Sequence, residues 1–277
     1  MIPGSSYVWQ ALAASCRGAS HEVAGTDNQD ACTTLTVGDV TAVAVADGHG
    51  DAAHFRSRDG SRIAVDLAVQ LMSEAARRVG DPTELSSCLQ NEVTQQLVDD
   101  WRRRVLDHAT AVPISPDMDG RLDGGGDRTV LRAYGTTLVA LVATPATLGL
   151  LQIGDGDAIA VFDDGAVVRP LPDDPMLDGI HTTSMSQTNA ATHMRATVLD
   201  LTQRQLRLAL AATDGFAASQ VDGAGWWRQV GEELAGHLRE HGAAYIGQKL
   251  PGWLEEPAGT GGDDTTMGVL LNTALDG

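Results

Sequence analysis

Residues 40–50 read VTAVAVADGHG, an apolar run that ends in a turn of aspartate, glycine and histidine. The run Val40–Ala46 is short and carries β-branched residues at alternate places, which predicts a buried β-strand. Asp47 opens the turn, so its carboxylate stands at the mouth of that strand. Gly48 beside it lets the backbone approach a ligand closely and offer its own carbonyl oxygen.

The same arrangement recurs along the chain. Apolar segments run into or out of aspartate turns at Leu148–Ile153 with Gly154-Asp155-Gly156-Asp157, Leu206–Ala212 with Thr213-Asp214-Gly215, and Met267–Leu271 after Gly261-Gly262-Asp263-Asp264. A further motif, Asn28-Gln29-Asp30, comes before the first strands. Asp-Gly is a common turn pair, so each motif taken singly indicates only a turn. Their recurrence at the ends of buried strands is what predicts a shared site.

Neighbouring strands would bring these carboxylates together. Uncompensated carboxylates a few ångströms apart repel by roughly 4 kcal/mol per close pair at an effective dielectric constant of about 20. Such a cluster needs a cation. Oxygen ligands without a majority of Cys or His select hard ions such as Mg²⁺ or Mn²⁺. The sequence therefore predicts a site for two or more divalent metal ions.

The chain has 277 residues, with 19 basic and 37 acidic side chains and a formal net charge of −18. This charge argues against nucleic acid and against an anionic membrane surface, because both partners need clustered Lys and Arg. Three cysteines, Cys16, Cys32 and Cys88, without a Cys-x-x-Cys pair suit a reducing cytosol. The N-terminus lacks a signal-peptide pattern, so we expect a cytoplasmic protein.

The order of predicted elements favours antiparallel sheets with helices on their outer faces. Apolar residues at helical spacing predict helices at Ser61–Val79, Leu85–Ala109 and Trp226–Leu250. Strands are predicted at Val40–Ala46, Thr137–Ala143, Thr147–Ile153, Ala158–Phe162, Leu206–Ala212 and Met267–Leu271. A mobile surface loop is predicted near 111–129, which is rich in Pro, Gly and Asp, and a functional flap near 173–195. We expect residues 1–277 to form one domain.

An ordered set of motifs resembles the protein phosphatase 2C family, the metal-dependent serine/threonine phosphatases. The matching stretches are Asn28-Gln29-Asp30, Ala46-Asp47-Gly48-His49-Gly50, Gly135-Thr136-Thr137, Ile153-Gly154-Asp155, Ala212-Thr213-Asp214-Gly215 and Gly262-Asp263-Asp264-Thr265-Thr266. Each motif alone is unspecific, whereas their order along residues 25–270 is specific. The run from Phe55 to Arg62 is similar to a bacterial branch of the family.

The resemblance implies an α+β fold, a four-layer αββα sandwich of two mainly antiparallel sheets flanked by helices. It also implies two Mn²⁺ or Mg²⁺ ions, with a third in many members, in the cleft between the sheets. The implied ligands are Asp47 bridging two ions, the Gly48 carbonyl, Asp214 and Asp263 at the first ion, Asp30 at the second directly or through water, and Asp155 at the third.

The implied reaction is hydrolysis of phosphoserine and phosphothreonine in proteins by a hydroxide that bridges the metals. His49 matches the general acid that protonates the leaving alcohol, a step worth roughly 10²–10⁴-fold. A histidine in a glycine-rich turn is also typical of an ordinary surface residue. The expected partner is a phosphorylated protein produced by a serine/threonine kinase, and the enzyme is expected to be a monomer.

Departures from the family pattern leave part of the site open. Gln29 stands where the family often has Glu, and we assign Gln29 and Asp264 to support the ligands rather than to bind ions. Gly25 replaces the family's phosphate-binding arginine. Three basic residues are candidates for its role: Arg56, His21 and Arg17. Two alternatives stay open: a phosphatase dedicated to one regulator, as in partner switching, and a weakly active or inactive binding module with this fold.

Overall fold

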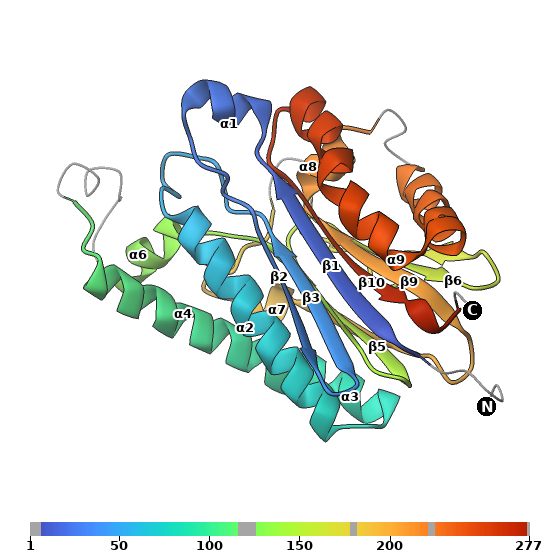
Figure 1. Cartoon of the computed structure of the whole chain (residues 1–277). Coiled ribbons are helices and arrows are strands. Elements are labelled where there is room, and N and C mark those ends of the chain that lie inside the picture. Colours follow the sequence, from blue (N-terminus) through green and yellow to red (C-terminus); the bar gives the residue numbers. More distant parts are fainter. Residues whose placement is uncertain (1–6, 116–125, 178–181, 221–224, 276–277) are drawn as a thin grey trace.

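The computed structural model describes residues 7–115, 126–177, 182–220 and 225–275. Two five-stranded sheets lie face to face, and helices cover the outer face of each sheet (Figure 1). The strand pairings within these residues are all antiparallel. The prediction of an α+β fold with a four-layer αββα sandwich is therefore confirmed.

The strand order is β1-β10-β9-β6-β7 in the first sheet and β2-β3-β4-β5-β8 in the second. The first sheet consists of β1 (Trp9–Cys16), β6 (Asp157–Phe162), β7 (Val167–Val168), β9 (Leu206–Ala212) and β10 (Thr265–Asn272). The second consists of β2 (Ala31–Val37), β3 (Val40–Ala46), β4 (Leu138–Ala143), β5 (Thr147–Ile153) and β8 (Arg195–Asp200). The predicted bounds of β3, β5 and β9 are confirmed.

Helices α2 and α4 cover the second sheet, and α9 covers the first. The helices on the side of the second sheet are α2 (Ser57–Arg78), α3 (Pro82–Cys88), the π-helical segment η1 (Leu89–Val93), α4 (Thr94–Ala111), α6 (Asp127–Ala133) and α7 (Ala190–His193). The others are α1 (Ala19–Ala24), α8 (Asp214–Ala218), α9 (Trp226–Gly261) and the 3-10 turn η2 (Thr273–Leu275).

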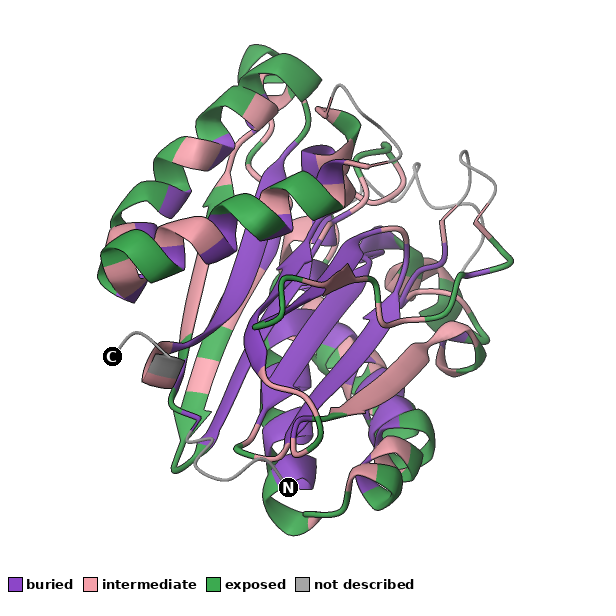
Figure 2. Ribbon diagram, turned by 90° about the vertical axis from the view of Figure 1, so that its right-hand side faces the viewer, coloured by how far each residue is buried: buried purple, intermediate pink, exposed green. Residues whose placement is uncertain are grey.

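The unbroken apolar sequence of β3 follows from its position between two cores. Val43 and Val45 belong to the core between the sheets, whereas Ala42 and Ala44 belong to the core beneath the helices. Successive side chains of a strand point to opposite faces, so a strand buried on both faces is apolar at every position. Figure 2 shows the central strands buried along their length. A third core lies between the first sheet and α9.

The flap predicted near 173–195 contains more regular structure than expected. It includes α7, and β8 begins within it at Arg195. Strand β8 was not predicted. It is an edge strand that pairs with β5 and is only half-buried, so polar residues interrupt its apolar pattern. Residues 178–181 of the predicted flap lie outside the described residues.

The predicted loop near 111–129 is shorter than expected on both sides. Helix α4 continues to Ala111 and α6 begins at Asp127, while residues 116–125 lie outside the described residues. Strand β1 and helix α1 were also not predicted. The last helix extends beyond Leu250 to Gly261 and is broken at Gly242, whose φ of 76° interrupts the helical backbone. Within the described ranges, no helix has the length and apolarity needed to cross a bilayer.

Gly60 marks a close contact between α2 and the segment that precedes β4. A Cβ atom there would lie 1.9 Å from the carbonyl oxygen of Tyr134, a backbone atom that cannot move alone. We expect Gly60→Ala to lower the free energy of unfolding by roughly 1–3 kcal/mol in urea titrations, as overpacking does. The matched control is Gly236→Ala in α9, where a Cβ meets nothing within 4 Å. It should be neutral or stabilising, and equal effects of the two variants would contradict this packing.

Candidate metal centre

The aspartate turns of both sheets meet at one end of the sandwich. In the second sheet, the end of β3, the start of β4 and the end of β5 are paired with one another. In the first sheet, Ala212 at the end of β9 pairs with Met267 near the start of β10 and with Asp157 at the start of β6. The turns after β3, β5 and β9 therefore converge although they lie far apart in the sequence.

Three of the predicted ligands form a compact cluster. Asp47, Asp155 and Asp214 each offer a carboxylate oxygen, and these oxygens lie within 4.8 Å of one another. All three line a cleft of about 1020 Å³, and Gly48 and Asp263 line it as well. Carboxylates from two sheets and an adjacent glycine turn thus share one wall of the cleft.

The electrostatic state of these carboxylates indicates what they can bind. Burial raises the pKa of Asp47 well above its ordinary value, and the charges of Asp30 and Asp214 raise it further. Burial is also the chief cause that raises the pKa of Asp30 to about 8 and that of Asp214 to about 6. Oδ1 of Asp155 is buried without a hydrogen-bond partner among the described residues. Asp47 and Asp214, whose raised pKa values show that their charges lack compensation, fit a hard divalent cation as the missing partner.

The Gly135-Thr136-Thr137 motif holds the Asp47 turn in place. The Asp47 carbonyl accepts hydrogen bonds from the Thr137 backbone N–H and the Thr136 hydroxyl, both at 2.8 Å. The Asp47 N–H donates to the Thr137 hydroxyl at 3.1 Å. At Gly48 a Cβ atom would lie 2.6 Å from the carbonyl oxygen of Gln29, so a larger residue does not fit. The turn is therefore fixed before any ligand arrives.

Asp30 lies next to Asp47 but is not among the residues that line the cleft. Its Oδ2 accepts a hydrogen bond from the Thr213 hydroxyl at 2.8 Å. It also lines a separate pocket of about 360 Å³ together with Arg58 and Arg62. The structure therefore places Asp30 behind the carboxylate cluster rather than on its open side.

The neighbours Asp263 and Asp264 have different surroundings. Asp263 is exposed and lines the cleft, whereas Asp264 is buried. The Asp264 carboxylate accepts hydrogen bonds from the backbone N–H groups of Gly18 at 2.8 Å and Gln29 at 2.7 Å. The Gln29 side chain donates to the Ser57 hydroxyl at 2.8 Å. Asp264 and Gln29 thus join the N-terminal segment to the strands that carry the cluster.

Of the three basic residues predicted to hold substrate phosphate, the structure brings only His21 to the cleft. Arg56 instead donates to the Tyr134 hydroxyl at 2.6 Å and to the Pro113 carbonyl at 3.1 Å. Arg17 donates to the His21 carbonyl at 2.7 Å. For these two arginines the prediction is corrected, because their guanidinium groups are engaged away from the cleft.

Two arginines that are not among the predicted site residues, Arg128 and Arg132 of α6, line the cleft. Both side chains are exposed, and neither forms an ion pair with another described residue. The signal available in the sequence was their spacing of four residues just before Gly135-Thr136-Thr137. It was missed because Arg128 fell within the loop predicted near 111–129 and no element was predicted between that loop and Thr137, where Arg132 lies.

His49 lines the cleft as predicted from its turn, and it has a histidine neighbour. Burial, followed by the charge of His54, lowers the pKa of His49 to about 4. The two rings contact edge to face with centroids 4.9 Å apart. His54, which is not among the predicted site residues, also lines the cleft.

Residues 182–186 of the flap form hydrogen bonds with the turns that surround the carboxylate cluster. The Thr183 hydroxyl accepts a hydrogen bond from the Gly154 N–H at 2.9 Å and donates to Asp174 at 3.2 Å. The Met185 N–H donates to the Thr136 carbonyl at 2.9 Å. The flap therefore supports the turn that presents Asp155.

The raised pKa of Asp30 predicts how metal-free protein responds to pH. The pKa of an aspartate in the unfolded chain is about 3.9, whereas the pKa of Asp30 in the folded protein is about 8. Between these values the folded state holds a proton that the unfolded state has released, so stability falls as pH rises. After dialysis against EDTA, we expect the free energy of unfolding to decrease from about pH 6.5 to about pH 8.

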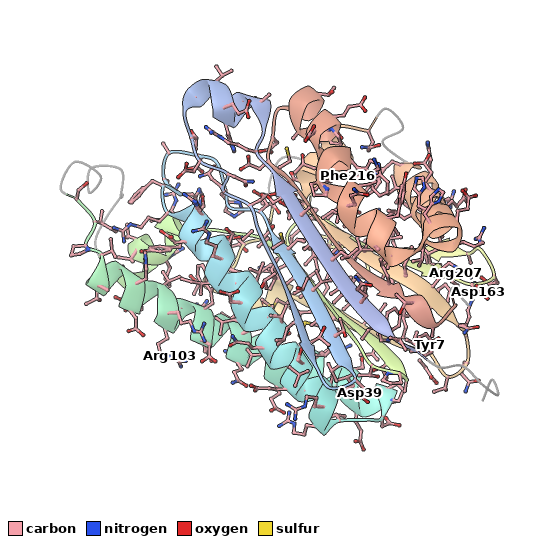
Figure 3. All side chains as sticks on the ribbon, in the orientation of Figure 1. Tyr7, Asp39, Arg103, Asp163, Arg207 and Phe216 are labelled. Carbon is pink, nitrogen blue, oxygen red and sulfur yellow. The ribbon has the colours of Figure 1, made fainter. Side chains whose placement is uncertain are left out.

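The window above about pH 6.5 excludes His49 and His54, whose lowered pKa values reduce stability only at more acidic pH. Asp30→Asn should make the decrease smaller, since an amide does not titrate, while Asp47, whose pKa is also raised, accounts for the rest. Asp39→Asn, an exposed aspartate in the turn between β2 and β3 (Figure 3), should retain it. A wild-type stability that is flat or rises across this window would contradict the assignment.

The sequence matches the family described as protein phosphatase 2C over residues 17–255. No curated protein matches it. A bacterial serine phosphatase has a similar fold, with 14% identity, coverage of 96% of this chain and 98% of the other, and a TM-score of 0.61. Stp1 from Staphylococcus aureus gives 14% identity, coverage of 98% and 97%, and a TM-score of 0.60. The PstP catalytic domain, solved with 2 manganese ions, gives 18%, 96% and 99%, and 0.54.

These structural likenesses, all at low identity, show the fold. The family match covers most of the chain and includes the turns that carry Asp30, Asp47, Asp155 and Asp214. The chain therefore belongs to the protein phosphatase 2C family, whose members are metal-dependent serine/threonine protein phosphatases.

Proposed function

We propose that this chain hydrolyses phosphoserine and phosphothreonine in proteins with two divalent ions, Mn²⁺ or Mg²⁺, and room for a third. The observation that carries the proposal is the convergence of Asp47, Asp155 and Asp214 within 4.8 Å in one cleft. Family membership and the two manganese ions of PstP support it. The proposed ligands are Asp47, the Gly48 carbonyl, Asp155, Asp214 and Asp263, with Asp30 acting directly or through water.

The protein's own contribution is to hold these oxygens in position. Divalent ions bound there supply a water of lowered pKa as nucleophile and offset charge on the phosphoryl oxygens. The hydrogen bonds from Thr136 and Thr137 fix the Asp47 turn, and the hydrogen bond that Asp264 accepts from Gln29 fixes the segment before Asp30. Such positioning is the main protein contribution in phosphoryl transfer, because the reacting groups come from substrate and water.

Arg128 and Arg132 are proposed to bind the substrate phosphate together with His21. A chain with a net charge of −18 repels a phosphate dianion overall, so cations beside the cleft have to offset that field. The two arginines line the cleft and are not engaged in ion pairs with described residues. A planar guanidinium suits the bidentate recognition of phosphate oxygens. A proton must also reach the departing alcohol, and His49 is the predicted donor.

The structure favours an active enzyme over an inactive binding module. The neutral Gln29 and the missing N-terminal arginine were the features that suggested inactivity. Gln29 is used to bond Ser57, and cations reach the cleft from α6 instead. The carboxylate cluster is complete without either feature.

Removal of metal or of one carboxylate tests this function directly. With Mn²⁺ present, we expect hydrolysis of a phosphoserine peptide and of p-nitrophenyl phosphate, and EDTA should abolish both. Asp214→Asn should lower kcat/KM by roughly 100-fold or more, because a metal ligand loses its charge. Asp39→Asn serves as the control, since Asp39 lies at the opposite end of β3 from Asp47 (Figure 3). Activity that survives EDTA or Asp214→Asn would refute the proposal.

The α6 arginines should affect substrate binding more than turnover. We expect Arg132→Gln and Arg128→Gln each to raise KM for p-nitrophenyl phosphate roughly tenfold, about 1.4 kcal/mol of binding, with a smaller change in kcat. The control is Arg103→Gln on α4, which makes the same charge change where Arg103 pairs with Asp100 (Figure 3). Steady-state kinetics at fixed Mn²⁺ give the comparison. Unchanged KM in both α6 variants would remove these arginines from the phosphate site.

A further inference from the structure

A cavity of about 420 Å³ lies between α8, α9 and β10. No described residue lines both this cavity and the metal cleft. Cavities that hold small organic ligands have volumes of roughly 300–1,000 Å³, so a molecule of that kind fits here. The proposed phosphatase reaction makes no use of this space.

The break in α9 at Gly242 creates the cavity. It divides the helix into two segments, both of which pack on the first sheet (Figure 1). In an unbroken helix Val230 and Leu254 would lie roughly 36 Å apart, whereas both line this cavity. Each segment contributes side chains at i, i+3, i+4 and i+7, which share one helix face. They are Val230, Glu233, Leu234 and His237 from the first segment, and Leu250, Trp253, Leu254 and Pro257 from the second.

The innermost lining of the cavity is apolar. Phe216, Leu250, Leu254 and Met267 line it, and each is between 1% and 7% exposed. These side chains offer no hydrogen bonds, so they favour an occupant whose apolar body displaces water from them. The buried part of the cavity therefore selects for a hydrocarbon or aromatic group.

The exposed part of the lining carries negative charge. Glu233 and Glu256 both line the cavity and are exposed, and neither forms an ion pair with another described residue. Oε1 of Glu233 accepts a hydrogen bond from the Gln229 side chain at 2.9 Å. Among the described residues, no Lys or Arg lines the cavity. Charge complementarity therefore favours a cationic occupant.

An aromatic ring lies between the acidic and the apolar parts of the lining. The Trp253 indole stacks on the His237 imidazole, with centroids 5.0 Å apart and an interplanar angle of 23°. This contact joins the two segments of α9 and orients the indole at the cavity. Indole and phenyl faces attract organic cations, and Phe216 supplies a second ring. Carboxylates beside aromatic rings are the groups that recognise an ammonium with an apolar body.

We propose that this cavity binds a small organic cation, an amine that carries an aromatic or aliphatic body. The body packs on Phe216, Leu254 and Met267, and the ammonium lies beside the carboxylates of Glu233 and Glu256. The site uses neither the metal ions nor the substrate phosphate, so it goes beyond the proposed function. The enclosed apolar lining distinguishes it from an extended groove for a protein chain.

Three probes of similar size and different charge test the proposal: 2-phenylethylamine, 2-phenylethanol and 3-phenylpropionate. Each is titrated into ¹⁵N-labelled protein with Mg²⁺ present, and the indole N–H resonances are followed by NMR. We expect the amine to shift the Trp253 resonance saturably, and Trp253→Leu identifies that resonance. Trp9 and Trp101 do not line the cavity and should stay unshifted. The alcohol and the carboxylate should bind roughly tenfold more weakly, since they lack two favourable charge contacts of roughly threefold each.

The carboxylates are tested by a matched pair of double variants. Glu233→Gln combined with Glu256→Gln should raise the Kd for the amine roughly tenfold. Glu232→Gln combined with Glu255→Gln is the control and should leave the Kd unchanged. It makes the same charge change at neighbouring exposed positions that do not line the cavity.

Any of three results would overturn the proposal. The first is the absence of a saturable Trp253 shift with the amine. The second is binding of the alcohol or the carboxylate as tight as that of the amine. The third is an equal change of Kd in the two double variants. These readouts do not involve hydrolysis, so loss of metal-dependent phosphatase activity would refute the proposed function alone.

Discussion

Repulsion among half-buried carboxylates is the constraint on which the rest of this structure depends. Asp47, Asp155 and Asp214 have oxygens within 4.8 Å, and burial raises the pKa of Asp47 and Asp214. Without bound cations this arrangement destabilises the folded protein, since each close pair costs roughly 4 kcal/mol when both groups are charged. The sandwich maintains it because the three turns are ends of strands that are paired and buried elsewhere along their length. Burial of these strands in the core thus offsets the repulsion at their ends.

The hydrogen bonds around the cluster keep its geometry fixed. Thr136 and Thr137 form hydrogen bonds with the Asp47 turn, and Thr183 accepts one from the turn before Asp155. The Asp264 carboxylate accepts a hydrogen bond from the backbone of the N-terminal segment. These contacts join residues that are far apart in the sequence, so the whole fold is needed to form the site. A site prepared in this way reorganises little when ion and substrate bind, which is where electrostatic catalysis gains its advantage.

The strands that carry the cluster could be predicted because they are buried on both faces. Val40–Ala46 and Leu206–Ala212 are unbroken apolar runs, and their bounds agree with the structure. Edge elements could not be predicted in the same way. Strand β8 is half-buried and mixes polar with apolar residues, and β1 was likewise missed, although residues at its centre pack against the neighbouring layers.

Some residues of the site could likewise be predicted from the sequence, and others could not. Positions with a local signature, such as Asp47 and Asp214 in their glycine turns, could be found in the sequence. Arg132 could not, because its place depends on α6 folding back onto the Asp47 turn through Gly135. Arg56 shows the reverse error: it follows the aspartate turn closely in sequence, yet its guanidinium is used by Tyr134. Sequence proximity to the Asp-Gly turn was therefore a correct guide to the cleft for His49 and a wrong one for Arg56.

The carboxylate cluster is proposed to hold divalent ions. Anomalous X-ray diffraction at the manganese absorption edge, from crystals grown with Mn²⁺, tests it most directly. We expect at least two anomalous peaks within bonding distance of the Asp47 turn, one of them shared with Asp214. Ordered carboxylates at these positions with no anomalous peak between them would show that the cluster does not bind these ions.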